Sequence, residues 1–514
     1  MALSAVGWLC VRALFIDLRH PLISAASARI SPPVRILLLL LMIALAPLAR
    51  GSDPGPFAVR GYYLTYMRMP VMGLPEWKQA IDCFAEDRAN TLVLWMPGGF
   101  ASRKFPETWA YNKEHENNRA DFAADLIDYA HEKGLRILLG FTPFGYDGVN
   151  QFTLTRPELR ARKANGSEVD PFGIHCWGWS LCPAQPESQR LMKEYLREML
   201  FEFYPKADGI LVESSDYNAC QCERCHGHYY DHEFALVKEI SAELWQRQPA
   251  ATILVYPHYF TGKEVPGLSA RGSRQDFDER WGLFFTPHSA HYEPDLIRRA
   301  KVSVFSGPEA AQGTPASLAA AAREAQQHSV TGYLPSFEAF SYLFTHAEGG
   351  EPGLVGTRQK PLGLDPAGAG KMPYDDLLPR VQRFAFREFS ANPQLAFPEF
   401  ERRLAQEFFA DAASTAARDL LDLQRIWNFE CDWYWRSPLL DPVFLQRRAA
   451  AQRWPAERLR AYDENLKRLK EISAASTAVN PPAAQEMRRL AAEIAARWGD
   501  TIPSESVTSP RQPR

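Results

Sequence analysis

The chain has 514 residues, of which 46% are hydrophobic and 12% aromatic, so it can bury a large core as two or three domains or as one large barrel with an appendage. Its formal net charge of -3 gives no reason to expect nucleic acid or an anionic membrane surface as a partner. The 13 Trp, 19 Tyr and 30 Phe permit a carbohydrate cleft lined by aromatic rings, but composition alone does not establish one.

Residues 36–46, ILLLLLMIALA, form an unbroken apolar run that follows Arg35 and precedes the small residues Gly51 and Ser52. A basic flank, an apolar stretch of about 7–15 residues and a small-residue exit are typical of a secretory signal peptide, whereas a membrane span needs about 20 apolar residues. An uncleaved signal anchor is the alternative. We therefore expect residues 1–51 to be a leader outside the fold, and the protein to be exported, either to the periplasm or out of the cell.

Short, continuously apolar segments then alternate with segments of helical periodicity. The predicted strands lie at 59–66, 90–96, 135–141, 208–213, 251–257, 281–287, 301–306 and 331–337. The predicted helices lie at 75–87, 119–134, 186–204, 229–247 and 317–329. Strands without polar alternation are typical of parallel strands that are buried on both faces.

Eight such strands over about 280 residues match a (β/α)8 barrel, the TIM-barrel fold of the α/β class, whose usual size is about 250 residues. A doubly wound open sheet is the alternative. It is disfavoured because RMPVMGLPEW, after the first strand, contains only Gly73 and no glycine-rich phosphate-binding fingerprint. We expect the barrel to be the catalytic domain and to occupy residues 56–345.

The chain changes character after the barrel. Residues 346–371 are rich in Gly and Pro and are predicted to form a loop, either a linker or a segment overhanging the site. Residues 372–500 have helical periodicity and no convincing strand, which predicts an all-helical C-terminal domain. The end of the chain, 501–514, is predicted to be disordered.

The fourth predicted strand, DGILVE, ends in Glu213, and Asp216 follows three residues later. Active sites of this fold lie at the carboxyl ends of the strands, and packing does not require a carboxylate there. A general acid does require one, held in a partly apolar pocket that keeps it protonated near neutral pH. Glu213 is therefore the candidate acid, with ion pairing or loop capping as the structural alternative. Asp216 could orient it, contact substrate or begin a turn.

Glycosidic cleavage usually takes two carboxylates, about 5–5.5 Å apart for retention and about 6.5–9.5 Å apart for inversion. Glu309 lies just past the seventh predicted strand and Glu338 directly after the eighth, so both are candidates for the second group. Either carboxylate could instead stabilise the start of a helix, an alternative that applies more strongly to Glu309. Asp147, after the third strand, is a weaker candidate.

Aromatic and histidine side chains near other strand ends are compatible with sugar binding, although each alone is more often a packing residue. They are Tyr62, Trp95, Trp177, Trp179, Tyr256, His258, His288 and Tyr292. Histidines also suggest a metal, as in barrel amidohydrolases. That interpretation needs a His-x-His at the end of the first strand, which RGYYLTYMR lacks, so no catalytic metal and no cofactor are expected.

Five of the 8 cysteines are clustered in the sequence, at 176, 182, 220, 222 and 225. Cys182 with the CxCxxC segment could form a four-thiolate zinc site. In an exported protein paired disulfides are chemically simpler, and we favour them here. We expect Cys176 to be left out of the pairing, because a Trp-Gly-Trp loop separates it from Cys182. Either arrangement would brace the loops around Glu213.

These segments also carry a family resemblance. LCPAQPES, the strand ending in Glu213 and YNACQCERC together resemble a group of bacterial glycoside hydrolases of unassigned substrate, as does FREFSANPQLAFPEFERRLAQEFFAD further on. The resemblance implies a barrel similar to that of family-20 hexosaminidases and α-glucuronidases, with a helical C-terminal domain. Hexosaminidases place adjacent Asp and Glu at the fourth strand end, whereas here Val212 precedes Glu213, which argues against substrate-assisted cleavage of N-acetylhexosamines.

The sequence thus predicts an exported glycoside hydrolase that acts on a poly- or oligosaccharide by carboxylate acid/base catalysis. The alternative is a non-catalytic barrel that binds glycans or a protein partner. A carbohydrate substrate is expected, with no nucleic acid and no stable membrane insertion after signal cleavage. Sugar, linkage, stereochemistry and oligomeric state are left open.

Overall fold

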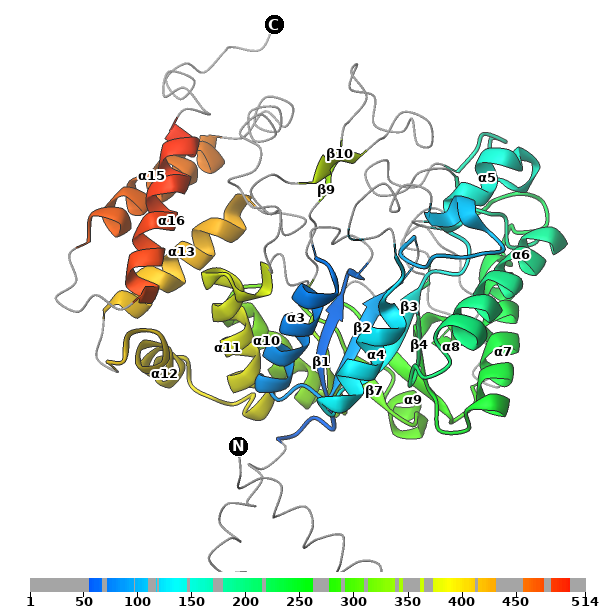
Figure 1. Ribbon diagram of the computed structural model, residues 1–514, viewed down its shortest axis with the longest axis horizontal. Helices are drawn as coiled ribbons and strands as arrows, with labels where there is room; N and C mark the ends of the chain where they lie inside the picture. The colour runs from blue at the N-terminus through cyan, green and yellow to red at the C-terminus, as the bar shows by residue number, and fades with distance from the viewer. Residues whose placement is uncertain are drawn as a thin grey trace, which may run out of the picture. The chain divides into compact units, whose positions relative to one another are not determined.

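The computed structural model describes a barrel and a set of C-terminal helices (Figure 1). The described residues are 55–66, 72–96, 98–109, 117, 120–145, 148–169, 179–214, 219–261, 277–287, 292–308, 313–337, 342–344, 361–364, 373–411, 415–430, 456–475 and 482–499. The predicted leader at 1–51 and the predicted tail at 501–514 lie outside them. None of the helices in this described part is both long and apolar enough to cross a bilayer.

Eight parallel strands close into a barrel in sequence order, which confirms the predicted fold class. They are β1 (Val59–Leu64), β2 (Thr91–Trp95), β3 (Arg136–Phe141), β4 (Gly209–Val212), β5 (Thr252–Val255), β6 (Trp281–Phe285), β7 (Ser303–Phe305) and β8 (Gly332–Tyr333). Pairing of β8 with β1, Val59 opposite Gly332, closes the ring. Every strand residue except two in β1 and β3 is buried, as expected for strands covered on both faces.

Helices on the outside connect these strands, and Figure 1 shows α3 and α4 in front of β1 and β2. The connecting helices are α3 (Leu74–Glu86), α4 (Ala123–Glu132), α6 (Pro186–Arg197), α7 (Tyr229–Arg247), α8 (His258–Thr261), α9 (Pro294–Arg299) and α10 (Pro315–Gln327). The helix predicted at 186–204 changes at its end into a π-helix, Glu198–Phe203. Short helices after β5 and β6 were not predicted, because four to six residues carry too little periodicity to be recognised.

The C-terminal part is helical, as predicted. It consists of α11 (Leu377–Ala391), α12 (Phe397–Phe409), α13 (Ala416–Glu430), α15 (Ala456–Ala474) and α16 (Pro482–Gly499). Helix α11 lies beside α10, and its Phe386 ring lies 4.5 Å from Tyr62 of β1. The helical part is therefore packed directly on the barrel wall.

The region expected to be only a loop contains some regular structure. Tyr342–Phe344 (β9) pairs antiparallel with Pro361–Leu364 (β10), the second strand lying inside the predicted loop at 346–371. Pro and Gly within PLGL concealed this strand from propensity arguments, because both residues are depleted in strands.

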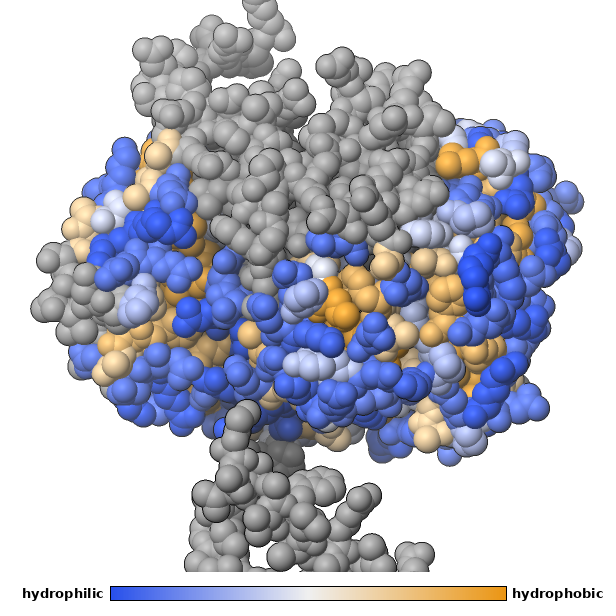
Figure 2. Space-filling view, in the orientation of Figure 1, coloured by the Kyte–Doolittle hydropathy of each residue, from blue (hydrophilic) through white to orange (hydrophobic). Residues whose placement is uncertain are grey.

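The outer surface matches the amphipathic pattern of the helices. The face in Figure 2 is mostly hydrophilic over the barrel helices, with smaller hydrophobic patches between them. Among the described residues, Phe397 is the large hydrophobic side chain that stands out as exposed, at 37%.

Candidate active site

Glu213 directly follows β4 at the carboxyl end of the strand. Its backbone N–H donates to the carbonyl of Phe141 at 2.9 Å, which continues the pairing of β4 with β3 by one residue. The side chain is half-buried, whereas Val212 before it and Ser214 after it are buried. Pairing with β3 therefore fixes the backbone of Glu213 at the end of the barrel where this fold places its chemistry.

Two tyrosines hold the carboxyl group of Glu213. The hydroxyl of Tyr63, in β1, donates to Oε2 at 3.1 Å, and that of Tyr256, directly after β5, donates to Oε1 at 2.9 Å. Each carboxyl oxygen is thus bound by a side chain from a different strand. A phenol hydroxyl can both donate and accept a hydrogen bond, so the same pair can orient an ionised or a protonated carboxyl group.

Buried aromatic rings pack against both of these tyrosines. The indole of Trp95, at the end of β2, lies 6.2 Å from the Tyr63 ring, and Phe284 of β6 stacks on Tyr256 at 5.9 Å with an interplanar angle of 2°. Both Trp95 and Phe284 are 2% exposed. Each of the two tyrosines that bind Glu213 is thus packed against a buried aromatic ring.

A second, fully buried carboxylate supports the chain beyond Glu213. Glu233, on α7, accepts a hydrogen bond from the Ser214 hydroxyl at 2.6 Å and another from the hydroxyl of Tyr259. Burial and, to a smaller degree, the charge of Glu233 raise the pKa of Tyr259 well above its ordinary value, so the phenol remains a donor. Glu233 thereby ties the residue after Glu213 to the outer helix layer.

Sequence reasoning missed Tyr63 and Glu233. Tyr63 was present in the predicted first strand, but its neighbour Tyr62 was chosen instead. The available signal was the alternation of side chains along a strand, which requires Tyr62 and Tyr63 to face opposite sides. It does not say which of the two faces into the barrel. No sequence signal distinguished Glu233 from the exposed acidic residues of an amphipathic helix.

The structure places Tyr62 and Tyr292, two of the substrate-binding candidates, among packing residues. Tyr62 faces out of the barrel: its ring is 2% exposed against α11, and its hydroxyl donates to Asp87 at 3.0 Å. Tyr292 stacks on His328 at 3.7 Å and donates to Glu324 of α10 at 3.0 Å. Both rings are engaged in packing between strands and outer helices, away from the group around Glu213.

His258 and Trp179 are also engaged in packing. His258 is 3% exposed and lies against Tyr230 at 4.6 Å and Tyr256 at 5.5 Å. It is therefore next to the site but behind Tyr256. The Trp179 ring is covered by the Arg160 guanidinium at 3.6 Å. The remaining candidates lie outside the described residues: Asp147, Trp177, Asp216, His288, Glu309 and Glu338.

The cysteine cluster has its thiols free. Cys182, Cys220, Cys222 and Cys225 are unpaired, and the sulfur of Cys182 lies 3.6 Å from that of Cys225 and 3.7 Å from that of Cys222. A disulfide bond would bring two sulfurs to about 2.05 Å. The structure therefore does not contain the disulfides favoured from the sequence among these four residues, because the chain gathers them at a common centre rather than in pairs. Cys176 lies outside the described residues.

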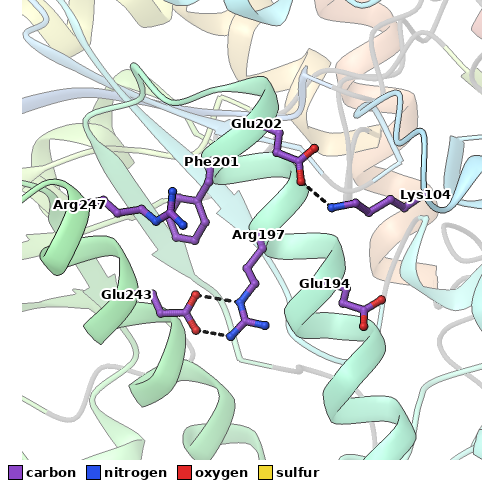
Figure 3. Close-up of a pocket in the computed structure, with 7 residues that line it drawn as sticks. All are labelled: Lys104, Glu194, Arg197, Phe201, Glu202, Glu243 and Arg247. Carbon is purple, nitrogen blue, oxygen red and sulfur yellow. Dashed lines mark hydrogen bonds and ion pairs between the residues drawn. The ribbon is translucent and has the colours of Figure 1, made fainter.

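A hollow of about 450 Å³ on the outside of the barrel is a different kind of feature (Figure 3). Figure 3 shows side chains of α6, the following π-helix and α7 meeting there, with Arg197 donating to Glu243 and Lys104 to Glu202. Arg247 covers the Phe201 ring at 4.2 Å. Its charged groups are thus paired with one another on the outer helices, which is a structural arrangement rather than a catalytic one.

Comparisons with known proteins give structural neighbours only, since no protein-family model and no curated protein matches the chain. A GH138 enzyme described as targeting the pectin rhamnogalacturonan II aligns with a TM-score of 0.49 and 12% identity, over 87% of this chain and 57% of that one. The Flavobacterium johnsoniae chitobiase, of family GH20, aligns with a TM-score of 0.41 and 12% identity, over 87% and 72%. A variant of the Thermobaculum terrenum O-GlcNAc hydrolase gives 0.42 and 11%, over 86% and 82%.

Family-20 enzymes, whose barrel the sequence resemblance implies, are thus among the structures found. With TM-scores below 0.5 and identities of 11–12%, these alignments do not assign an activity to this chain, which spans little more than half the length of the GH138 enzyme. The barrel itself is established by its own strand pairing.

Proposed function

We propose that this protein is an exported glycoside hydrolase that cleaves a poly- or oligosaccharide at the carboxyl ends of the barrel strands. Glu213 is the general acid. The observation that carries the proposal is the position of this half-buried carboxyl group, bound through both oxygens by Tyr63 and Tyr256. A general acid has to be held within hydrogen-bond reach of the leaving oxygen, and two tyrosines from separate strands supply that rigidity.

A second carboxylate completes the proposed mechanism, and its candidates are Asp216, Glu309 and Glu338. Glu338 is preferred because Phe337, the residue before it, donates its backbone N–H to the carbonyl of Tyr63 at 2.7 Å. Tyr63 in turn binds Glu213, so the chain approaches the acid directly before Glu338. The apolar run at 36–46, within the predicted leader, supports export.

The test is a screen of the mature protein against polysaccharides and aryl glycosides, followed by Glu213→Gln on any substrate found. This change keeps the shape and removes the proton donor, so kcat should fall by about 10²–10⁴-fold with KM little changed. Aryl glycosides with good leaving groups should lose less, because they depart without protonation.

Glu202→Gln is the matched control. Glu202 is an exposed acid that pairs with Lys104 on the outer surface, and its substitution should leave turnover unchanged. Near wild-type turnover of Glu213→Gln on a natural glycoside would refute the assignment of the acid. Saturable glycan binding by wild-type protein without any hydrolysis would instead support the non-catalytic alternative.

A further inference from the structure

The four-cysteine cluster is formed by two separate loops. Cys182 lies in the segment that leads into α6, and Cys220, Cys222 and Cys225 lie in the segment between β4 and α7. Their sulfur atoms all lie within 4.8 Å of one another. Cys182, Cys220 and Cys225 are at most 2% exposed, and Cys222 is half-buried.

The spacing of the sulfurs fits one tetrahedral metal ion. Zinc binds thiolate sulfur at about 2.3 Å, so two ligands of a regular tetrahedron are about 3.8 Å apart. The observed separations of 3.6 Å and 3.7 Å from Cys182 are close to that value. They are far longer than the bond of about 2.05 Å in a disulfide.

Backbone donors already face one of the sulfurs. The N–H of Arg162 donates to the Cys220 sulfur at 3.3 Å. The backbone of Cys222 makes a second hydrogen bond to the same sulfur. N–H groups of this kind stabilise a metal-bound thiolate and fix its direction.

The CERC segment has the compact turn that a pair of metal ligands requires. The N–H groups of Cys225 and His226 both donate to the carbonyl of Cys222 at 2.9 Å, which folds Cys225 back toward the other sulfurs. A hollow of about 250 Å³ borders Cys182 and Cys222, and its charged lining is mixed: Arg160, Arg162 and Arg224 lie there with Glu158 and Glu223. It provides an entry path for an ion.

We propose that Cys182, Cys220, Cys222 and Cys225 bind one structural Zn²⁺. Binding replaces four thiol protons, which are released to solvent, and leaves no coordination position open for catalysis. The ion joins the loop before α6 to the loop that begins after Glu213, and so stabilises one side of the candidate active site. The proposal is independent of the reaction that the barrel performs.

The test is metal analysis of the full mature protein, purified without chelators. About one zinc per chain is expected. Cys182→Ser should lower it to below about 0.2 per chain, because three thiolates bind more weakly than four. Cys83→Ser is the matched control: Cys83 is a free thiol on α3, outside the cluster, and its variant should keep the full zinc content.

Two further measurements do not depend on the folding of a variant. A mercurial thiol reagent added to wild-type protein should release the zinc into a metal indicator. Protein reloaded with Co²⁺ should show the thiolate charge-transfer and tetrahedral ligand-field bands of a four-sulfur site.

Several results would overturn the proposal. One is disulfide-linked peptides containing Cys182, Cys220, Cys222 or Cys225 in non-reducing mass spectrometry. The proposal would also fail if the protein contained iron in place of zinc, if Cys182→Ser kept its full zinc content, or if the protein neither contained zinc nor took it up.

Discussion

The contact between the barrel and the C-terminal helices contains a buried ion pair whose removal should be costly. Arg383 of α11 donates to Asp87, the residue directly after α3, through Nε at 2.7 Å and Nη2 at 3.2 Å. Their side chains are 8% and 3% exposed. Arg383 also donates to the carbonyl of Cys83 at 2.9 Å, and Tyr62 donates to Asp87.

Arg383→Met removes both of these hydrogen bonds to Asp87. The buried carboxylate keeps the hydrogen bond from the Tyr62 hydroxyl. Breaking a buried pair from one side costs about 3–5 kcal/mol, because the remaining charge is desolvated without compensation. We expect a loss of this size in the free energy of unfolding, measured by urea titration at pH about 7. Arg402→Met is the matched control: Arg402 pairs with Glu399 on an exposed helix face, and its removal should leave the free energy of unfolding nearly unchanged.

The pH dependence of the same variant tests the physical cause. Burial raises the pKa of Asp87 above its ordinary value, and Arg383 opposes that rise. Without Arg383 the folded state takes up a proton on Asp87 more readily than the unfolded state, so stability is gained as the pH falls. The loss relative to wild type should therefore be smaller at pH about 4.5 than at pH about 7.

A double-mutant cycle with Asp87→Asn completes the argument. The two changes should be less than additive by about 1–3 kcal/mol, because each removes the partner that the other depends on. The ion pair does not stabilise the contact between barrel and helices if Arg383→Met lowers the free energy of unfolding no more than Arg402→Met does. The same conclusion follows if the loss in that free energy does not change with pH.

Three further predictions follow from the fold and the site. Gly209→Ala should prevent folding or strongly destabilise the protein, because an added Cβ would lie 1.8 Å from the Thr252 carbonyl oxygen. Gly134→Ala also requires a positive φ, +79° against +153° at Gly209, but has open space, so equal losses of stability in urea titration of the two variants would contradict the clash. Tyr256→Phe should lower kcat on any substrate found and shift the alkaline limb of its pH–rate profile, since one donor to Glu213 is lost; an unchanged profile would show that Tyr256 does not bind the acid. Amino-terminal sequencing of the mature protein should give a start between about residues 47 and 53, and recovery of intact residues 1–51 in the cytosol would contradict export.

Much of the fold was determined by local patterns in the sequence. Apolar segments such as TLVLW and GILV, separated by helical periodicity, predicted the alternating barrel because parallel strands buried on both faces leave no polar alternation. The placement of Glu213 followed from the same reasoning, since the residue after GILV has to lie at the carboxyl end of its strand. These features depend on neighbours along the chain and need no knowledge of what lies opposite.

Only the tertiary structure decided which groups meet. Tyr62 and Tyr63 are indistinguishable in VRGYYLTY, and it is the register of β1 between β2 and β8 that turns Tyr63 toward Glu213 and Tyr62 toward α11. The sequence identified Cys182 and the CxCxxC segment as a group of thiols. Whether their sulfur atoms form disulfide pairs or surround one centre depends on distances between two loops, which the sequence does not contain. Arg383 and Asp87 are 296 residues apart, and no periodicity links them. Contacts of this kind arise when the barrel closes and the helices pack on it, so they are properties of the assembled chain.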